Sequence, residues 1–285
     1  MGKTSGIKIF ALLLGGWSAA VGSVMSAPAT AQSTVKYVAM GDSSAAGPLI
    51  PTQIDAQCLR SDHNWPHLVA AAIGAQLTDV TCSSATTADF SGKQFGAVAP
   101  QYQALSSDTN LVTVAVGAND IQMGSVVPSC INPAPAPSST ATYCKNFYVV
   151  NGVDQLRARV DTFAPTFGAV LDQIHKLAPA AKVVVTGYLT YYQAGGCWPK
   201  DPVWAADADY IQSTFDYLMQ TLQQQALAHN ATYADIRTPS AGHGVCAAVG
   251  TEWVDGVLVD QPTFFYHPTA QGMQGAARVI APALG

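Results

Sequence analysis

The chain has 285 residues, a formal net charge of −5 at pH 7 and a hydrophobic content of 49%. That length is ample for a large buried core. A mildly acidic chain without a basic run argues against nucleic acid or an anionic membrane as its main partner.

The first segment in chain order has the pattern of a secretory signal peptide. Lys3 and Lys8 precede the apolar run IFALLLGGWSAAVG, and the small residues of SAPATAQ follow it. The pattern predicts a signal peptide at 1–31 with cleavage after Ala31, and an extracellular protein with one mature domain at 32–285. A membrane anchor is the alternative, but glycine and serine interrupt the run before it reaches the ~20 residues that a span needs. We therefore expect no stable membrane insertion after cleavage.

Predicted strands and helices alternate along the mature chain. Five short apolar runs rich in β-branched residues are typical of buried strands, at 35–40, 77–82, 111–116, 182–187 and 231–236. Segments with helical spacing lie between them, at 65–74, 153–178 and 208–230. A last helix should begin after Pro268, and Pro165 should kink or split the helix that contains it. The alternation predicts right-handed βαβ connections, and so an α/β protein with a three-layer α/β/α, flavodoxin-like fold around a central parallel sheet of about five strands.

Residues 124–151 are rich in Pro, Ser and Ala and are predicted to form a long irregular insertion. Such a segment is either a lid or binding loop, or an inert surface loop. All six cysteines follow the predicted cleavage site: Cys58, Cys82, Cys130, Cys144, Cys197 and Cys246. An even count in an exported chain predicts disulfides, but fifteen connectivities remain open. The sequence lacks the close Cys or His spacing of a zinc site.

Polar residues follow the first three predicted strands. They belong to GDSSAAG, which begins at Gly41, to CSSATTAD, which begins at Cys82, and to GAND, which begins at Gly117. A fourth stretch, FFYHPTAQG, places His267 just before the last helix. Because ligands gather at the carboxyl ends of parallel strands, we expect these residues to lie together. They supply what acyl transfer needs, namely a serine nucleophile, a histidine base and hydrogen-bond donors for an oxyanion.

Several other motifs are absent from the sequence. The second residue after Ser43 is Ala45, so the G-x-S-x-G elbow is missing, and neither H-E-x-x-H nor a G-x-G-x-x-G after a strand occurs. The blocks GDSSAAG, CSSATT, GAND and HPTAQG, in this order across residues 41–272, instead resemble the four blocks of the SGNH (GDSL-type) hydrolases. The resemblance implies the SGNH fold and a serine esterase or lipase. The chemistry of such a hydrolase needs no metal and no organic cofactor.

The resemblance also assigns roles to individual residues. Ser43 matches the nucleophile, and His267 matches the base. The backbone N–H groups of Ser43 and Ser84 and the side-chain amide of Asn119 match the donors of the oxyanion hole. The family normally has glycine where Ser84 stands, so the loop loses conformational freedom here.

The acid of the common family pattern, Asp-x-x-His, is missing. Phe264 stands three residues before His267, and Asp260 is seven residues upstream. A backbone carbonyl can orient a histidine as a carboxylate does. The chain resembles a secreted, six-cysteine branch of the family that has a Ser-His dyad and a carbonyl-held histidine. This implies that the Phe264 carbonyl orients His267, and that disulfides form in chain order: Cys58–Cys82, Cys130–Cys144 and Cys197–Cys246.

Other polar residues near the four blocks have structural interpretations. Ser44 is expected to be a turn or packing residue, and Asp42 a cap of the following helix. His243 either lines the substrate groove or is an ordinary loop histidine. The aromatic residues of 188–198 either shape an acyl pocket or pack in the core.

The sequence thus predicts a secreted serine esterase or lipase that hydrolyses carboxylic esters through an acyl-serine intermediate. The expected substrates are lipid acyl esters. One alternative is an acetylesterase that acts on acetylated polysaccharide. Another is a catalytically silent binding protein on the same scaffold, suggested by the missing acid and by Ser84. We expect a monomer whose partner is an ester substrate.

Overall fold

The computed structural model describes residues 1–3, 6, 34–135 and 143–284. Residues 1–33 and 34–285 form two separate units, and every helix and strand of the described residues lies in the second. The predicted signal peptide at 1–31 lies almost entirely outside the described residues, as does its cleavage site after Ala31. Within the described part of the chain, no helix has both the length and the apolar character needed to cross a bilayer.

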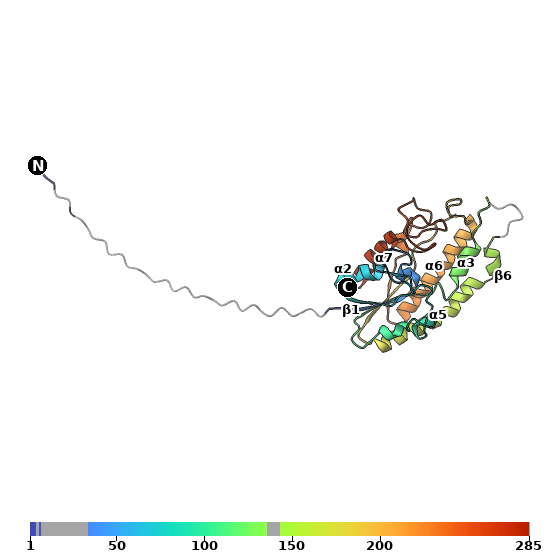
Figure 1. Cartoon of the computed structure of the whole chain (residues 1–285), viewed down its shortest axis with the longest axis horizontal. Helices are drawn as coiled ribbons and strands as arrows, with labels where there is room; N and C mark the ends of the chain where they lie inside the picture. The colour runs from blue at the N-terminus through green and yellow to red at the C-terminus, as the bar shows by residue number, and fades with distance from the viewer. Residues whose placement is uncertain (4–5, 7–33, 136–142, 285) are drawn as a thin grey trace. The chain divides into compact units, whose positions relative to one another are not determined.

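A parallel sheet of five strands forms the centre of the second unit (Figure 1). In chain order, the strands are β1 (Lys36–Gly41), β4 (Gln76–Asp79), β5 (Leu111–Ala115), β8 (Lys182–Thr186) and β9 (Thr232–Ala234). Their order in space is β4-β1-β5-β8-β9, and each neighbouring pair is parallel. The first strand therefore lies between the second and the third, which is the flavodoxin-like order. The predicted α/β class and five-stranded parallel sheet are confirmed.

Burial explains why the central strands could be read from the sequence. Strand β5 is buried along its whole length, and β1 and β8 are buried after their first residues. The edge strands β4 and β9 are shorter and only partly buried. A parallel strand that is covered on both faces needs an unbroken apolar run, whereas an edge strand does not.

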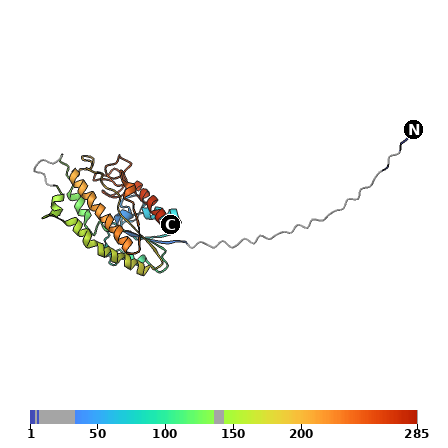
Figure 2. The same ribbon diagram turned by 180° about the vertical axis from the view of Figure 1, so that it is seen from behind.

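Helices cover both faces of the sheet. The helices α2 (Trp65–Ile73) and α7 (Ala270–Ala283) pack together on one face, and α5 (Gln155–Leu177) and α6 (Ala205–Ala228) pack together on the other (Figures 1 and 2). Asn64 caps α2 by accepting the His67 N–H, and Thr269 caps α7 by accepting the Gly272 N–H. The three-layer prediction is therefore confirmed.

Pro165 does not split α5, contrary to one of the two expectations. The helix runs through it for 23 residues. A proline removes one N–H and leaves the carbonyl four residues earlier without an intrahelical partner. Pro165 and Asp161, which carries that carbonyl, are both exposed, so water can satisfy it. The opposite face, with Phe163 and Phe167, is buried and holds the helix in place.

Shorter elements lie in the connections between these strands and helices. They are α1 (Ser43–Ala46), β2 (Gln53–Asp55), β3 (Arg60–Ser61), α3 (Met123–Ser129), α4 (Lys145–Tyr148), β6 (Val149–Val150), β7 (Val153–Asp154) and 3-10 turns at Thr87–Phe90, Gln101–Ala104 and Thr238–Ser240. The prediction that 124–151 is irregular is wrong in part, because α3, α4 and β6 lie largely within it. Residues 136–142 of this segment are outside the described residues.

Three disulfides join the six cysteines in the pairs Cys58–Cys82, Cys130–Cys144 and Cys197–Cys246. The pairing implied by the family resemblance is confirmed. The first disulfide ties the turn between β2 and β3 to the loop after β4. The second joins the residue directly after α3 to the residue directly before α4, and the third joins the loop after β8 to the loop after β9.

Candidate active site

The predicted site residues meet at the carboxyl ends of β1 and β5. Ser43 is the first residue of α1, directly after β1 and Asp42. Asn119 lies in the loop after β5, and β5 is the neighbour of β1 in the sheet. His267 comes from the loop before α7 and reaches the same place. The switch in strand order between β1 and β5 is the usual ligand site of such a sheet.

Ser43 and His267 are in hydrogen-bond contact. Ser43 Oγ lies 2.8 Å from His267 Nε2, and His267 Nδ1 lies 2.8 Å from the carbonyl oxygen of Phe265. Because a carbonyl can only accept, Nδ1 must carry the proton. Nε2 is then the unprotonated nitrogen, so it accepts the hydrogen bond from the serine hydroxyl. This is the arrangement that a serine nucleophile and its general base require.

The carbonyl that orients His267 belongs to Phe265, and the expectation of Phe264 is wrong. Tyr266 has a φ of 55°, in the left-handed region, and the backbone N–H of His267 bonds to the Phe264 carbonyl at 3.1 Å. That turn uses the Phe264 oxygen and leaves the Phe265 oxygen beside the ring. The side chain of Phe264 does contact the histidine, with its ring edge-on to the imidazole at a centroid distance of 5.3 Å.

No carboxylate of the described residues bonds to His267. The side chain of Asp260 is exposed, and its backbone N–H bonds to the buried carboxylate of Asp255. Burial lowers the pKa of His267 below its usual value, and the Phe265 carbonyl opposes this shift only partly. The imidazole is therefore neutral near pH 7 and able to take a proton.

Two backbone N–H groups of the predicted oxyanion hole have no hydrogen-bond partner among the described residues. They are the N–H groups of Ser43 itself and of Ser84. Ser84 has a φ of 67°, which is a left-handed conformation that glycine adopts more easily. Position 84 therefore keeps the backbone conformation that a glycine would adopt, although the residue there is serine. Ser84 is exposed and lies outside the lining of the cleft at Ser43.

Asn119 lies beside Ser43 in the cleft and is held by the loop that carries Ser84. Its side-chain amide donates to the Ala85 carbonyl at 3.0 Å. One N–H of the amide remains for another acceptor. The next residue, Asp120, accepts two bonds from Thr87 through Oδ1, at 3.0 Å from the N–H and 2.5 Å from the hydroxyl. The loops after β4 and β5 are thus joined side by side.

A network that the sequence did not predict joins the loops after β1, β5 and β8. Tyr188, just after β8, donates from its hydroxyl to Asp42 Oδ2 at 2.6 Å and accepts the Ala118 N–H at 2.8 Å. Asp42 also accepts the Ser44 N–H and hydroxyl through Oδ1, so it caps α1 as expected. Burial raises the pKa of Asp42 to about 6. The sequence singled out Tyr188 only as one of the aromatic residues of 188–198 that follow a predicted strand, without its partners.

The turn after β1 needs a glycine at position 41 because the backbone there passes close to β5. A Cβ on Gly41, whose φ is 149°, would lie 2.3 Å from the Ala115 carbonyl oxygen, with which the Asp42 N–H bonds at 2.8 Å. Any side chain would therefore push β1 and β5 apart. Ser44, which was expected to be a turn or packing residue, is a turn residue, because its N–H and hydroxyl both bond to Asp42.

The loop that carries His267 is anchored through a buried carboxylate. Asp201 Oδ2 accepts hydrogen bonds from the hydroxyls of Tyr192 and Tyr266, at 2.5 and 2.7 Å. Tyr266 directly precedes the histidine, so the anchor fixes the backbone next to it. His243, which was open to two interpretations, is a loop histidine, because it bonds to the Thr251 carbonyl and does not line the cleft.

A small apolar cleft of about 110 Å³ lies over Ser43. Its walls include Met123, Val127 and Pro128 of α3, so the segment that was expected to be a lid or an inert loop contributes through its first helix. Tyr188 and Tyr191 line the cleft and are also buried, which means that the aromatic residues after β8 serve both of the suggested purposes. The described residues contain no group of three or more His, Cys, Asp or Glu side chains that could hold a metal ion.

Comparison with known proteins relates this geometry to characterised relatives. The model of the GDSL-like Lipase/Acylhydrolase family matches residues 39–274. A curated protein named Lipase 2, from Streptomyces coelicolor, is 35% identical over 91% of this chain and 89% of its own length.

Two solved structures are also similar. The extracellular lipase from Streptomyces rimosus has a TM-score of 0.72 at 28% identity, and phospholipase A1 from Streptomyces albidoflavus NA297 has a TM-score of 0.68 at 27% identity. Each match covers 88% of this chain and 100% of the other.

Proposed function

Because the chain belongs to the GDSL-like lipase/acylhydrolase family and is a carboxylic ester hydrolase, we propose that Ser43 and His267 are its catalytic dyad. The observation that carries the proposal is the Oγ–Nε2 contact of 2.8 Å, together with the Nδ1 proton held by the Phe265 carbonyl. These two bonds select the tautomer in which Nε2 is the base. The intact pair speaks against a silent binding protein.

The reaction proceeds through an acyl-serine intermediate. Ser43 Oγ attacks the ester carbonyl carbon while its proton passes to His267 Nε2. The tetrahedral intermediate collapses as Nε2 returns this proton to the departing alcohol oxygen. Nε2 then takes a proton from water, whose oxygen attacks the acyl carbon, and the acid leaves as Ser43 regains its proton. The Phe265 carbonyl holds Nδ1–H throughout, in the place of the usual carboxylate.

The oxyanion is stabilised by the N–H groups of Ser43 and Ser84 and by the side-chain amide of Asn119. The two backbone groups have no other partner among the described residues, and the amide has one N–H left after its bond to Ala85. Donors that are fixed before the reaction need no reorganisation when charge develops on the carbonyl oxygen.

The substrates that this site fits best are lipid acyl esters. The cleft over Ser43 is lined mainly by apolar and aromatic side chains, and the relatives compared above are named lipases or phospholipase A1. The acetylesterase alternative has less support. Secretion through the predicted signal peptide is supported by the three disulfides, which persist in oxidising compartments. The extracellular relative supports it as well. A monomer remains our expectation.

The nucleophile can be tested with a fluorophosphonate probe, which reacts covalently with activated serines. We expect the wild type to be labelled and Ser43→Ala to be unlabelled. Ser44→Ala is the matched control, because it removes the neighbouring hydroxyl and should remain labelled. Labelling of Ser43→Ala to the wild-type level would rule out the dyad.

The acyl preference can be tested with nitrophenyl esters of increasing chain length. An apolar cleft predicts that kcat/KM rises from acetate toward longer acyl groups, by up to about tenfold for each two methylenes that become buried. Activity on acetate alone would contradict the lipid proposal and favour the acetylesterase.

A further inference from the structure

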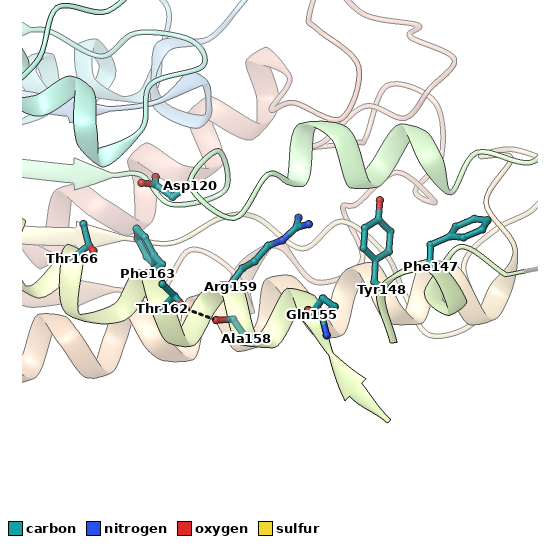
Figure 3. Close-up of a pocket in the computed structure, with 9 residues that line it drawn as sticks. All are labelled: Asp120, Phe147, Tyr148, Gln155, Ala158, Arg159, Thr162, Phe163 and Thr166. Carbon is teal, nitrogen blue, oxygen red and sulfur yellow. Dashed lines mark hydrogen bonds between the residues drawn. The ribbon is translucent and has the colours of Figure 1, made fainter. Parts of the chain in front are cut away.

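The cavity along α5 does not support the candidate base, His267. It has a volume of about 540 Å³, and Figure 3 shows the residues that line it. None of them lines the cleft of the candidate active site. Its polar side chains include Asp120, which bonds to Thr87, and Arg159, which bonds to a carbonyl of the loop after β5. The groups that hold the histidine therefore lie elsewhere.

Asp201 is a buried carboxylate that joins three segments of the chain. It exposes 1% of its surface. Its Oδ2 accepts the hydroxyls of Tyr192 and Tyr266 at 2.5 and 2.7 Å, and its Oδ1 accepts the Val257 N–H at 2.9 Å. Burial raises the pKa of both tyrosines far above the usual value, so each hydroxyl keeps its proton and donates it. No lysine, arginine or histidine of the described residues forms an ion pair with Asp201.

The backbone around Asp201 leaves room for this carboxylate. A Cβ on Gly256 would lie 2.6 Å from Asp201 Oδ1, so a side chain there would displace the carboxylate or the backbone. Two neighbouring carboxylates are also buried, but Asp255 bonds to backbone N–H groups of its own loop and Glu252 pairs with Lys200. Of these three carboxylates, only that of Asp201 bonds to the side chain next to the candidate base.

Tyr266 connects Asp201 to the carbonyl that orients His267. The Phe265 carbonyl belongs to the peptide group between Phe265 and Tyr266, and the φ of Tyr266, 55°, sets the angle between that group and the tyrosine side chain. Such a φ persists in a residue other than glycine only where its surroundings hold it. The Tyr266 N–H bonds to the Asp255 carbonyl at 3.1 Å and its hydroxyl bonds to Asp201. These two bonds therefore help to keep the Phe265 oxygen at 2.8 Å from Nδ1.

We propose that Asp201 is the positioning carboxylate of the dyad, and that it holds the Phe265 carbonyl against Nδ1 of His267 through the Tyr266 hydroxyl. In a triad, the carboxylate orients the histidine by direct contact. Here the carboxylate acts through an intervening residue, because it has no hydrogen bond to the histidine. The inference rests on the proposed function, since it takes His267 as the base.

A matched pair of tyrosine variants tests this role. Tyr266→Phe and Tyr192→Phe each remove a buried hydroxyl that donates to the same oxygen of Asp201, but only Tyr266 adjoins the histidine. We expect Tyr266→Phe to lower kcat on nitrophenyl butyrate about 10- to 100-fold, the usual loss when an outer partner that orients a histidine is removed, with KM unchanged. Tyr192→Phe should lower stability by a similar amount but keep kcat within about twofold of the wild type.

Proton NMR supplies a readout that a loss of stability alone would not change. The Nδ1 proton that bonds to the Phe265 carbonyl should give a low-field signal, and His267→Gln identifies the signal by removing it. The signal should broaden or vanish in Tyr266→Phe and persist in Tyr192→Phe. Asp201→Asn combined with Tyr266→Phe should lower kcat no further than Asp201→Asn alone, because the carboxylate acts through this tyrosine.

The other outcomes separate the inference from the proposed function. Equal losses of kcat in the two tyrosine variants, an unchanged kcat or NMR signal in Tyr266→Phe, or additive losses in the double variant would overturn the inference. The proposed function would still stand if the fluorophosphonate labels Ser43 of the wild type. If Asp201→Asn does not fold, the tyrosine pair decides the question by itself. A wild type that is neither labelled nor active on esters would reject the proposed function, and the inference with it.

Discussion

At the scale of single residues, the notable feature is a histidine whose partner is neutral. The Phe265 carbonyl fixes the tautomer and orientation of His267, which are two of the tasks that a carboxylate performs in a triad. A carbonyl carries only a partial charge, so the imidazolium that forms during attack in the proposed mechanism is less stabilised than beside a carboxylate. Burial in an apolar surrounding acts in the same direction, since it disfavours the charged ring.

The pH dependence of kcat/KM should report this environment. His267 must be neutral to act as a base, and its pKa lies below the usual 6.5. Activity should therefore be lost as pH falls through a midpoint below 6.5. Asp42 titrates in the same region, at about 6, so Asp42→Asn is the control and should keep the acid limb. A midpoint at or above 6.5 would contradict the assignment of a buried, carbonyl-held base.

At the scale of elements, the site depends on loops that are bonded to one another at the strand ends. Tyr188 joins the turn after β1 to the loop after β5, and Thr87 joins the loop after β4 to Asp120. Arg159 holds the same loop from α5. The candidate site thus consists of loops at the strand ends, and each loop is held by a side chain from another part of the fold.

Replacing Tyr188 by Phe tests this description. The change leaves the Asp42 carboxylate and the Ala118 N–H each without one bond, which should lower the free energy of unfolding by about 1–3 kcal/mol. We expect kcat on a nitrophenyl ester to fall about tenfold, a barrier increase of about 1.4 kcal/mol, because Ser43 and Asn119 are no longer held in register. KM should change little.

Tyr217→Phe is the matched control for this variant. The Tyr217 hydroxyl bonds to Asp161 between α6 and α5, away from the strand ends, so its loss should leave kcat unchanged. If Tyr188→Phe lowers stability but not kcat, the network is structural only and does not position the catalytic groups.

At the scale of the whole molecule, the covalent links hold the long connections of an otherwise regular α/β unit. The Cys197–Cys246 disulfide spans 49 residues and joins the regions around Asp201 and His243. The Cys130–Cys144 disulfide spans only 14 residues. In the chain-entropy account, a cross-link restricts the unfolded chain more when it closes a longer loop.

Removal of each disulfide by a double alanine substitution should therefore lower stability unequally. We expect a loss of about 4 kcal/mol for Cys197 and Cys246 and about 3 kcal/mol for Cys130 and Cys144. For the first pair, the melting temperature should fall by about 10 °C in differential scanning calorimetry. A larger loss for the shorter loop would show that native-state contacts, and not loop length, govern the effect.

Much of the fold and of the proposed dyad followed from the sequence alone. Continuous apolar runs between amphipathic helices indicate a parallel sheet because burial on both faces leaves them no polar position, and β1, β5 and β8 were found in this way. Ser43, Asn119 and His267 lie at strand or helix ends in recognisable blocks, so their common location follows from the topology. The contact between Ser43 and His267 agrees with that expectation.

Other features were decided only by the tertiary structure. Which carbonyl orients His267 depends on the left-handed turn at Tyr266, and a non-glycine residue in that conformation is held there by surrounding bonds that no local pattern encodes. Tyr188 reaches Asp42 across 146 residues, and Arg159 reaches Ile121 across 38. Periodicity and caps are local properties and can be read along the chain. The partner of a side chain across the fold depends on how the layers pack against each other. That packing is not a local property, so only the tertiary structure decides it.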